Sequence, residues 1–402
     1  MPNTKLNWPL AVSSFSLLDK LKIGWFLIRE PIWTYGSWVR KYEEKWEKTL
    51  GCAHAIMVSS GSTANELIAL RRKWELQQAG EWPRRNKVIF PVNTWISSVS
   101  VWINLGFEPV FVDVSPINLN VTKEGLASVL ASDNGGFIGT VFYTALLGYF
   151  NDLNECKSLT EAHGARFLMD NCEASFSYFV NAETGSLDPI INFVTCSTSV
   201  FFSHFTSSGT EGGLIFTSSQ EEAEWYRMAR SHGLTRGMPD KYKNPNVSPD
   251  FDFYMLGSNY RSSNLQAYMA ALDFDRAFQF SIEKRKEIMD EVQEGLCWDI
   301  FYPFCTRGYI STRALYVPLA IPILCRLKSD RVRIEAALKA AGVMTRPIIG
   351  GTLLAHTAFK GYGNVDDYPV AKWAHECGFY IGLHPKVTPE MVKRVIELLN
   401  TL

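Results

Sequence analysis

Three places in this sequence have residue types that can bind an anion or an aromatic ring. Ser60-Gly61-Ser62-Thr63 opens a predicted helix, where free backbone N–H groups, the helix dipole and two hydroxyls can hold a phosphate dianion. Asp170 ends the apolar run RFLM, and a carboxylate there can pair with a protonated pyridine nitrogen, which makes such a ring a better electron sink. Trp95 follows PVNT and can lie flat on an aromatic ring.

His204 is the residue in this set that can move a proton near neutral pH. It lies in CSTSVFFSHFTSSGTEGG, between a Ser/Thr-rich strand and a Gly-rich turn. With an ordinary pKa of about 6.5, an imidazole exchanges protons at neutral pH, but it forms no lasting Schiff base with an aldehyde. A zinc site on His204 and His232 is an alternative, although neither histidine has a second ligand at helical spacing.

Each of these residues also has a purely structural interpretation. Ser60 and its neighbours can simply cap a helix, and Asp170 can cap the turn DNCEAS. Trp95 can be a core or interface tryptophan, and a single histidine is most often structural. The local sequence alone leaves both interpretations open.

Predicted strands and helices alternate along the first half of the chain. Amphipathic periodicity, capping residues and short apolar runs predict helices at 39–50, 64–77, 96–104, 122–131 and 152–163, and strands at 55–58, 87–91, 109–114, 138–143 and 166–170. This order predicts a largely parallel sheet with helices on both faces. SSGST, PVNTW and DNCEA each follow a predicted strand, so we expect these loops to meet at one edge of the sheet.

The last third of the sequence predicts a smaller α+β unit. A long helical segment over 265–296 is followed by a strand at 316–324, a charged helix at 331–342 and a final amphipathic helix at 389–399. We expect a large α/β domain at 1–275 and a small C-terminal α+β domain at 276–402.

Composition and charge narrow the class of protein. A formal net charge of -1 argues against nucleic acid or an anionic membrane as the main partner. The eight cysteines, 305 among them, have neither CxxC pairs nor metal-ligand spacing, so we expect mostly buried thiols in a reducing compartment. No apolar run has the length of a membrane span, and the N-terminus lacks the features of a signal peptide. These features together predict a cytoplasmic protein.

Taken together, the motifs resemble the sugar aminotransferase family of fold-type I pyridoxal phosphate enzymes, the DegT/DnrJ/EryC/StrS group. SSGSTANELIAL resembles its phosphate-binding turn, FLMDNCEASFS its aspartate-bearing strand, and ECGFYIGLHPKVTPEMVKRVIELL its C-terminal domain. RSHGLTR and GSNYRSSNLQAYMAAL resemble the segment that reaches the neighbouring subunit's site. The resemblance therefore implies the fold-type I fold and a homodimer with shared active sites.

The resemblance also implies roles for individual residues. Trp95 would stack on the cofactor ring, and Asp170 would pair with the ring nitrogen. Glu173 occupies the place where the family usually has a glutamine near the ring hydroxyl. The residues implied to bind the cofactor phosphate are Ser62, Thr63, Ser199 and, from the other subunit, Asn259.

The family's aminotransferases carry a lysine where this chain has His204, seven residues before Glu-Gly-Gly. The same exchange marks the nucleotide-sugar 3-dehydratases, and TRPIIGGTLLAHTAF is similar to a segment of that subgroup, although His356 and its neighbours differ. The resemblance implies non-covalently bound pyridoxal or pyridoxamine phosphate and removal of the C3 hydroxyl of a nucleotide-linked 4-keto-6-deoxyhexose. Residues 198–296 contain no cysteine, which disfavours the iron-sulfur subtype and favours glutamate as the amino donor that restores the pyridoxamine form.

Two other functions remain open at this point. An aminotransferase would need a lysine elsewhere, but no lysine occurs between Lys157 and Lys241. A catalytically inactive homologue that binds a sugar or the cofactor has no chemical reason to keep Asp170, Trp95 and Asn259. No motif reports on the nucleotide, and GDP and CDP sugars are first choices by resemblance alone.

Overall fold

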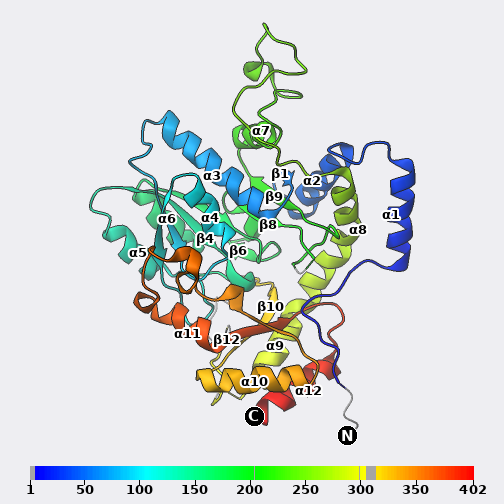
Figure 1. The fold of residues 1–402 in the computed structure, drawn as a ribbon, viewed down its shortest axis with the longest axis vertical. Coiled ribbons are helices and arrows are strands. Elements are labelled where there is room, and N and C mark those ends of the chain that lie inside the picture. Colours follow the sequence, from blue (N-terminus) through cyan, green and yellow to red (C-terminus); the bar gives the residue numbers. More distant parts are fainter. Residues whose placement is uncertain (1–4, 203, 298, 305–313) are drawn as a thin grey trace.

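The computed structural model describes residues 5–202, 204–297, 299–304 and 314–402, and a seven-stranded sheet forms its centre (Figure 1). The strand order is β1-β9-β8-β5-β4-β2-β3. All neighbours pair in parallel except that β9 runs antiparallel to β1 and to β8. The strands are β1 His54–Val58, β2 Lys87–Pro91, β3 Glu108–Val112, β4 Ile138–Thr144, β5 Arg166–Asp170, β8 Cys196–Ser199 and β9 Gly213–Thr217.

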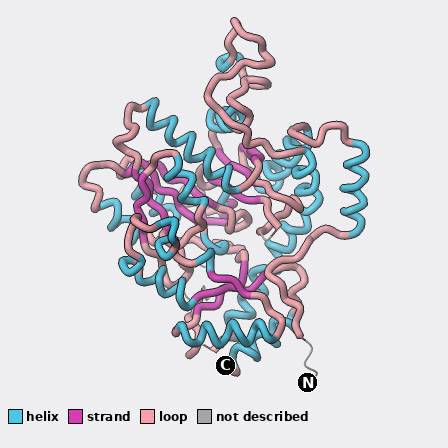
Figure 2. The backbone as a smooth tube through the Cα atoms, viewed as in Figure 1, coloured by secondary structure: helices cyan, strands magenta, loops and turns pink. Residues whose placement is uncertain are grey.

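Helices pack against this sheet and connect its strands (Figure 2). One group packs around β1, β8 and β9, and another around β3 and β5. The helices of this part of the chain are α1 Leu17–Arg29, α2 Ser37–Leu50, α3 Gly61–Gln78, α4 Ser97–Asn104, α5 Lys123–Ala131, α6 Leu153–Ala162, α7 Gln220–Ala229 and α8 Asn264–Phe280. A hairpin of β6 Tyr178–Val180 and β7 Leu187–Pro189 follows β5, and the long connection between α7 and α8 projects from the molecule.

A three-stranded antiparallel sheet of order β10-β12-β11 forms the C-terminal part. A π-helical turn, Ser281–Arg285, joins α8 to α9 without interrupting the helical path. Helix α8 packs on α2, whereas α9 packs on the last helix of the chain. The elements here are α9 Lys286–Gly295, β10 Ala320–Leu324, α10 Lys328–Ala340, β11 Thr345–Pro347, α11 Pro369–Cys377, β12 Gly378–Gly382 and α12 Pro389–Asn400.

The predicted fold class is confirmed, although the sequence did not indicate several of the elements, β9 and α1 among them. Strand β9 is short and fully buried, and it begins at Gly213 directly after Gly212, so it has no alternating pattern. Helix α1 was also not predicted. The strand predicted at 316–324 begins only at Ala320. The division at residues 275 and 276 falls inside α8, and the proposed domain boundary stays a prediction.

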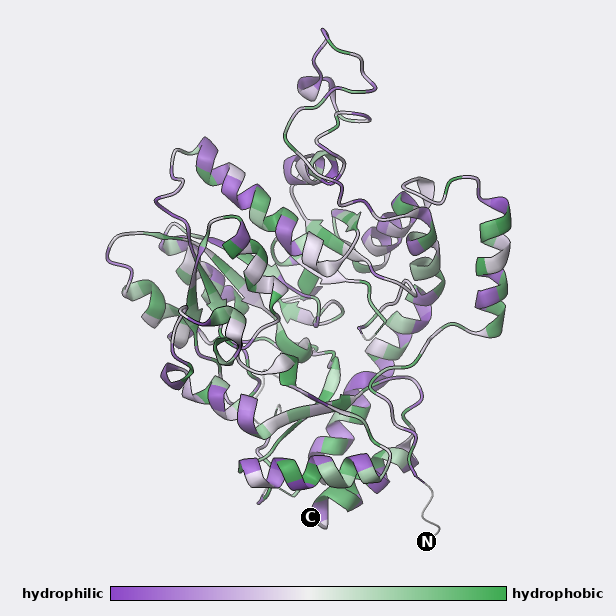
Figure 3. Ribbon diagram, in the orientation of Figure 1, coloured by the Kyte–Doolittle hydropathy of each residue, from purple (hydrophilic) through white to green (hydrophobic). Residues whose placement is uncertain are grey.

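Aromatic packing joins the helices to the sheet. Trp46 of α2 is fully buried and lies 5.3, 5.2 and 5.0 Å, centroid to centroid, from the rings of Phe176, Phe216 and Phe274. Coloured by hydropathy, the central strands are mostly apolar, whereas the helices have mixed character (Figure 3). Of the cysteines, 172 and 297 are partly exposed, 305 lies outside the described residues, and the rest are buried. No helix in the described ranges is long and apolar enough to cross a membrane.

The outer helix α1 leaves apolar side chains in contact with solvent. Leu17, Leu21, Trp25 and Ile28 follow one another at helical spacing, and each is more than half exposed. The projecting connection adds Phe251 and other exposed apolar residues. Apolar surface on this scale is typical of a contact with another macromolecule.

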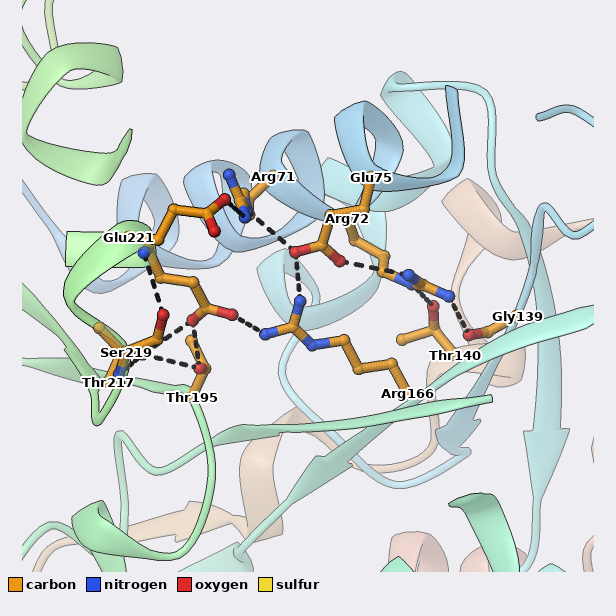
Figure 4. A network of polar contacts seen from close by, with 11 residues as sticks. Arg71, Arg72, Glu75, Gly139, Thr140, Arg166, Thr195, Thr217, Ser219 and Glu221 are labelled. Atoms are coloured by element: carbon orange, nitrogen blue, oxygen red, sulfur yellow. Dashed lines mark hydrogen bonds and ion pairs between the residues drawn. The ribbon is translucent and has the colours of Figure 1, made fainter. Parts of the chain in front are cut away.

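A buried ionic network holds α3 and α7 at the edge of the sheet where β5 begins (Figure 4). The guanidinium of Arg166 pairs with Glu75 of α3 and with Glu222 of α7. Glu222 also accepts hydrogen bonds from the hydroxyls of Thr195 (2.6 Å) and Thr217 (2.8 Å). Burial alone would raise the pKa of Glu222, but Arg166 and these hydroxyls lower it below its ordinary value.

We expect Arg166→Met to lower the free energy of unfolding by about 3 kcal/mol, because Glu222 then stays buried without a cation. Chemical denaturation at pH 7 measures this change. The control Lys157→Gln removes a surface pair with Glu161 and should change stability by less than about 0.5 kcal/mol. Equal stability of the two variants would contradict a supporting role for the network.

Candidate active site

Asp170 is the buried carboxylate at the carboxyl end of β5, and it is only 3% exposed. Its Oδ2 accepts hydrogen bonds from Asn65 Nδ2 of α3 (2.7 Å) and from Ser98 Oγ of α4 (2.7 Å). Its Oδ1 accepts from the backbone N–H of Cys172 (3.0 Å). The loops after β1, β2 and β5 therefore meet at one edge of the sheet, as the sequence predicted.

The first turn of α3 lies directly beside the end of β8. Ser60 and Thr63 form a capping box, in which each side chain binds the other residue's backbone N–H. A Cβ placed on Gly61 would lie 2.9 Å from Cβ of Ser199 and 3.0 Å from Sγ of Cys172, so only glycine fits here. The backbone N–H groups of Gly61 and Ser62 begin the helix, and helix-initiating N–H groups lack intrahelical acceptors.

The structure gives the two hydroxyl residues of this turn different surroundings. Ser62 is exposed and donates to Ser97 Oγ (2.9 Å), so its hydroxyl remains accessible to a ligand. The Thr63 hydroxyl is occupied by the capping box. The structural interpretation of Ser60 and Thr63 as a cap is therefore correct, and phosphate binding by Ser62 and Thr63 stays a prediction.

His204 is held through one ring nitrogen by the loop after β5 and the end of β8. Its Nδ1 lies 2.9 Å from the carbonyl oxygen of Cys172 and 2.6 Å from Oγ of Ser199. A carbonyl can only accept, so this contact places the proton on Nδ1 and leaves the lone pair of Nε2 available in the neutral ring.

The surroundings of His204 favour the neutral imidazole. Burial lowers the pKa of His204 below its ordinary 6.5, the nearby Arg285 lowers it further, and the Cys172 carbonyl and Asp170 oppose this shift. Above that lowered pKa the ring is a free base. The arrangement can therefore take a proton from a ligand at Nε2 and later return it.

Glu173 follows Asp170 in the same loop. Its Oε2 accepts a hydrogen bond from the backbone N–H of Leu147 (2.8 Å), a residue with the positive φ of 55°. Burial, reinforced by the charge of Asp170, raises the pKa of Glu173 to about 8, whereas the Leu147 N–H opposes this shift. At pH 7 the carboxyl is therefore mostly protonated and offers a donor as well as an acceptor, as a glutamine does.

Trp95 and Asn259 lie outside the hydrogen-bonded cluster around Asp170. Trp95 is 55% exposed at the end of the loop after β2, which leaves its indole free to meet a ligand. Asn259 is exposed in the connection before α8, where its side-chain oxygen accepts from Arg261 Nε (3.1 Å). The contacts predicted for these two residues stay predictions.

The zinc alternative receives no support from this geometry. In the part of the chain that the structure describes, no three His, Cys, Asp or Glu side chains group closely enough to hold a metal ion. His232 is exposed and lies beside Arg261 Nη2 at 3.4 Å, a cation that would repel a metal.

Sequence reasoning missed the residues that support Asp170 and His204. Asn65 and Ser98 are buried polar residues, and Asn65 also accepts a hydrogen bond from Ser197 of β8. The signal that was available is a polar side chain on the apolar face of each helix. The carbonyl of Cys172 leaves no trace in a sequence, because every residue has one.

The sequence and the fold of this chain are similar to those of known proteins. The model of the DegT/DnrJ/EryC1/StrS aminotransferase family matches residues 26–400. A GDP-4-keto-6-deoxy-D-mannose 3-dehydratase of Escherichia coli O55:H7 is 27% identical over 398 residues, which cover 94% of this chain and 96% of that protein.

Two solved structures share the fold. An E. coli GDP-4-keto-6-deoxy-D-mannose-3-dehydratase with bound hydrated PLP has a TM-score of 0.84 at 23% identity, covering 98% of this chain and all of that chain. An aminotransferase from Psychrobacter cryohalolentis has a TM-score of 0.82 at 19% identity, covering 99% of this chain and 98% of that one. At such identities these likenesses show the fold alone.

We expect His204 to titrate below 6.5 and to carry its neutral proton on Nδ1. Nitrogen-15 NMR of the histidine rings between pH 5 and 8, with His204→Asn as the assignment control, measures both. Because the folded-state pKa is lowered, this group contributes stability above the unfolded pKa that is lost as pH falls below it. A proton on Nε2 would show that the Cys172 carbonyl does not set the tautomer, and a pKa above 6.5 would show that burial does not dominate the titration of this ring.

Proposed function

Because the chain belongs to the DegT/DnrJ/EryC1/StrS aminotransferase family, we propose that it is a pyridoxal phosphate-dependent 3-dehydratase of a nucleotide-linked 4-keto-6-deoxyhexose. The observation that carries the proposal is His204, a base with one fixed nitrogen, at the position where the family's aminotransferases have lysine. Similarity to a 3-dehydratase over 94% of the chain supports it. The reaction removes the C3 hydroxyl and leads to a 3,6-dideoxy sugar.

The site has the donors and acceptors that the cofactor requires. The first turn of α3, with its helix-initiating N–H groups and the accessible Ser62 hydroxyl, suits a phosphate dianion. The buried Asp170 carries a negative charge that a ring N–H⁺ would compensate. We assign Ser62, Thr63 and Ser199 to the phosphate, Trp95 to the ring face, and Glu173 to the ring hydroxyl.

Bound pyridoxamine phosphate supplies an amine that condenses with the sugar ketone and a conjugated ring that accepts electrons. Asp170 keeps the ring nitrogen protonated. His204 Nε2 takes the proton made acidic by this ring, while Nδ1 stays bonded to the Cys172 carbonyl. The imidazolium then protonates the departing C3 hydroxyl, which leaves as water and returns His204 to its neutral form.

A lysine at position 204 would instead attack the bound intermediate and restore transamination. A histidine moves the proton and forms no bond to carbon, so the cofactor stays non-covalently held. Glutamate would give the amino group that restores the pyridoxamine form and would leave as 2-oxoglutarate, and hydrolysis of the released product would set ammonia free.

We also propose a homodimer in which Asn259 of the partner subunit completes the phosphate site. The exposed carboxamide of Asn259 and the exposed apolar residues of α1 support a contact between two copies. A GDP-linked sugar is the first substrate to test, since the similar relative acts on one. The cytoplasm is the proposed location, because its reducing conditions suit unpaired cysteines.

The first test is to add pyridoxal phosphate and glutamate to the purified protein, treat half with borohydride, and compare intact masses and absorbance spectra. We expect conversion to the pyridoxamine form without a covalent adduct, because position 204 has a histidine and no lysine that could form one. His204→Lys is the matched positive control and should yield a trapped adduct. A stable adduct on the parent protein would restore the aminotransferase hypothesis.

A second test replaces the base. His204→Asn should lower the rate of dehydration by roughly 10²- to 10⁴-fold, because it removes the proton acceptor. The dissociation constant of the cofactor should change little, since the α3 turn and Asp170 remain. The control His163→Asn alters a histidine paired with Asp133, away from this site. Dehydration by His204→Asn at the parental rate would overturn the assignment of the base.

A further inference from the structure

Arg285 is a buried arginine that no step of the proposed mechanism uses. It ends the π-helical turn between α8 and α9, and only 5% of it is exposed. Single π-helical turns inside longer helices occur frequently at functional sites. The Nη1 of Arg285 donates to the backbone carbonyls of Leu319 (2.7 Å) and Pro318 (3.2 Å). The side chain thus joins the long helical path to the chain just before β10.

The stability of the fold alone does not account for an arginine at this position. Burial lowers the pKa of Arg285 to about 9, and in the described ranges no carboxylate opposes this shift. The group is still a cation at pH 7, and a buried charge without a counter-ion costs free energy. A neutral amide could donate to a carbonyl without that cost.

One contact of Arg285 leads to Glu173 through a chain of hydrogen bonds. Leu319, whose carbonyl accepts from Arg285, donates its backbone N–H to the carbonyl of Leu147 (3.1 Å). The N–H of Leu147 in turn donates to Oε2 of Glu173 (2.8 Å). Arg285 therefore holds Leu319 in place and, through Leu147, supports the carboxyl of Glu173.

A second contact of Arg285 leads to the segment of His204. The guanidinium carbon lies 4.9 Å from the ring centroid of Phe205, the residue that follows His204. Phe205 is buried, and its ring lies 5.5 Å from that of Phe176 in the loop after β5. A cation is attracted to the face of an aromatic ring, and more strongly where both are removed from water. Arg285 therefore also holds the chain next to His204.

We propose that Arg285 is a positioning residue for the dehydration, which fixes His204 and Glu173 relative to each other. This inference rests on the proposed function, in which the base must meet a cofactor that Glu173 helps to orient. His204 follows β8 and Glu173 follows β5, and one side chain supports both segments. A misplacement of about 1 Å at a reacting group can cost roughly 100-fold in rate.

The charge of Arg285 also acts on the base that it positions. Burial lowers the pKa of His204 and Arg285 lowers it further, whereas the Cys172 carbonyl and the charge of Asp170 raise it. The thiol of Cys172 stays neutral, because burial raises its pKa. Loss of the cation should therefore raise the pKa of His204, a change that loss of packing at a distance from the ring would not cause.

The test uses Arg285→Met, which removes the charge and the donors of a long side chain. With protein preloaded with pyridoxamine phosphate and GDP-4-keto-6-deoxy-D-mannose as the probe, single-turnover dehydration should slow roughly 10-fold or more. Cofactor affinity should not change, since the α3 turn and Asp170 remain. Nitrogen-15 NMR should show a raised pKa of His204. Arg285→Lys keeps a cation and should restore this pKa and most of the rate.

A matched control separates this role from general loss of stability. Arg72→Met removes a mostly buried arginine of α3 that also donates to a backbone carbonyl, that of Gly139 (2.9 Å) near the start of β4. This is the sheet edge opposite the site, so the rate and the pKa of His204 should stay at parental values. Chemical denaturation of both variants measures their stability.

Parental dehydration by Arg285→Met, or a slower rate with an unmoved pKa of His204, would overturn the inference. If Arg285→Met does not fold, Phe205→Leu carries the test, because it keeps Arg285 and removes the ring that the guanidinium faces. This variant should also slow dehydration, and a parental rate would contradict the inference. A parent protein that dehydrates no nucleotide sugar would instead refute the proposed function, and the NMR comparison would still decide whether Arg285 acts on His204.

Discussion

A carboxylate buried at the end of a strand needs donors from every side, and Asp170 imposes this requirement on the whole sheet edge. Its three donors come from α3, from α4 and from its own loop. They are distant in sequence, so they can meet only if β1, β2 and β5 end at the same edge. The order and direction of the strands therefore serve the site as well as the core.

His204 depends on this edge in the same way. The carbonyl that binds its Nδ1 belongs to Cys172, whose N–H binds Asp170. One short loop therefore holds the carboxylate of Asp170 and also sets the tautomer of His204. A solved aminotransferase shares the overall fold closely. The fold therefore does not determine whether an amino group is transferred or a hydroxyl is removed. The side chain at position 204 can determine it.

The C-terminal part of the chain contributes to the site by contacts with its loops. The carbonyl of Leu147, whose N–H binds Glu173, accepts from the N–H of Leu319 just before β10. Asp113, just after β3, accepts from the first N–H groups of α11. The positive φ of Leu147 costs free energy, and the two hydrogen bonds made by its own N–H and carbonyl hold this residue in place. Residues of the small sheet are thus fixed relative to those of the large one.

The sequence by itself determined the alternation of strands and helices, the three polar loops at one edge and the presence of histidine at position 204, since these follow from local periodicity and residue type. It did not reveal β9, whose short buried run lacks alternation, or the support that Asn65 and Ser98 give to Asp170. Only the tertiary structure placed the carbonyl of Cys172 against His204. Such contacts depend on which strands are neighbours in the sheet. They also depend on the free energy that each polar side chain loses when it is removed from water, and the spacing of residues along the chain reports neither.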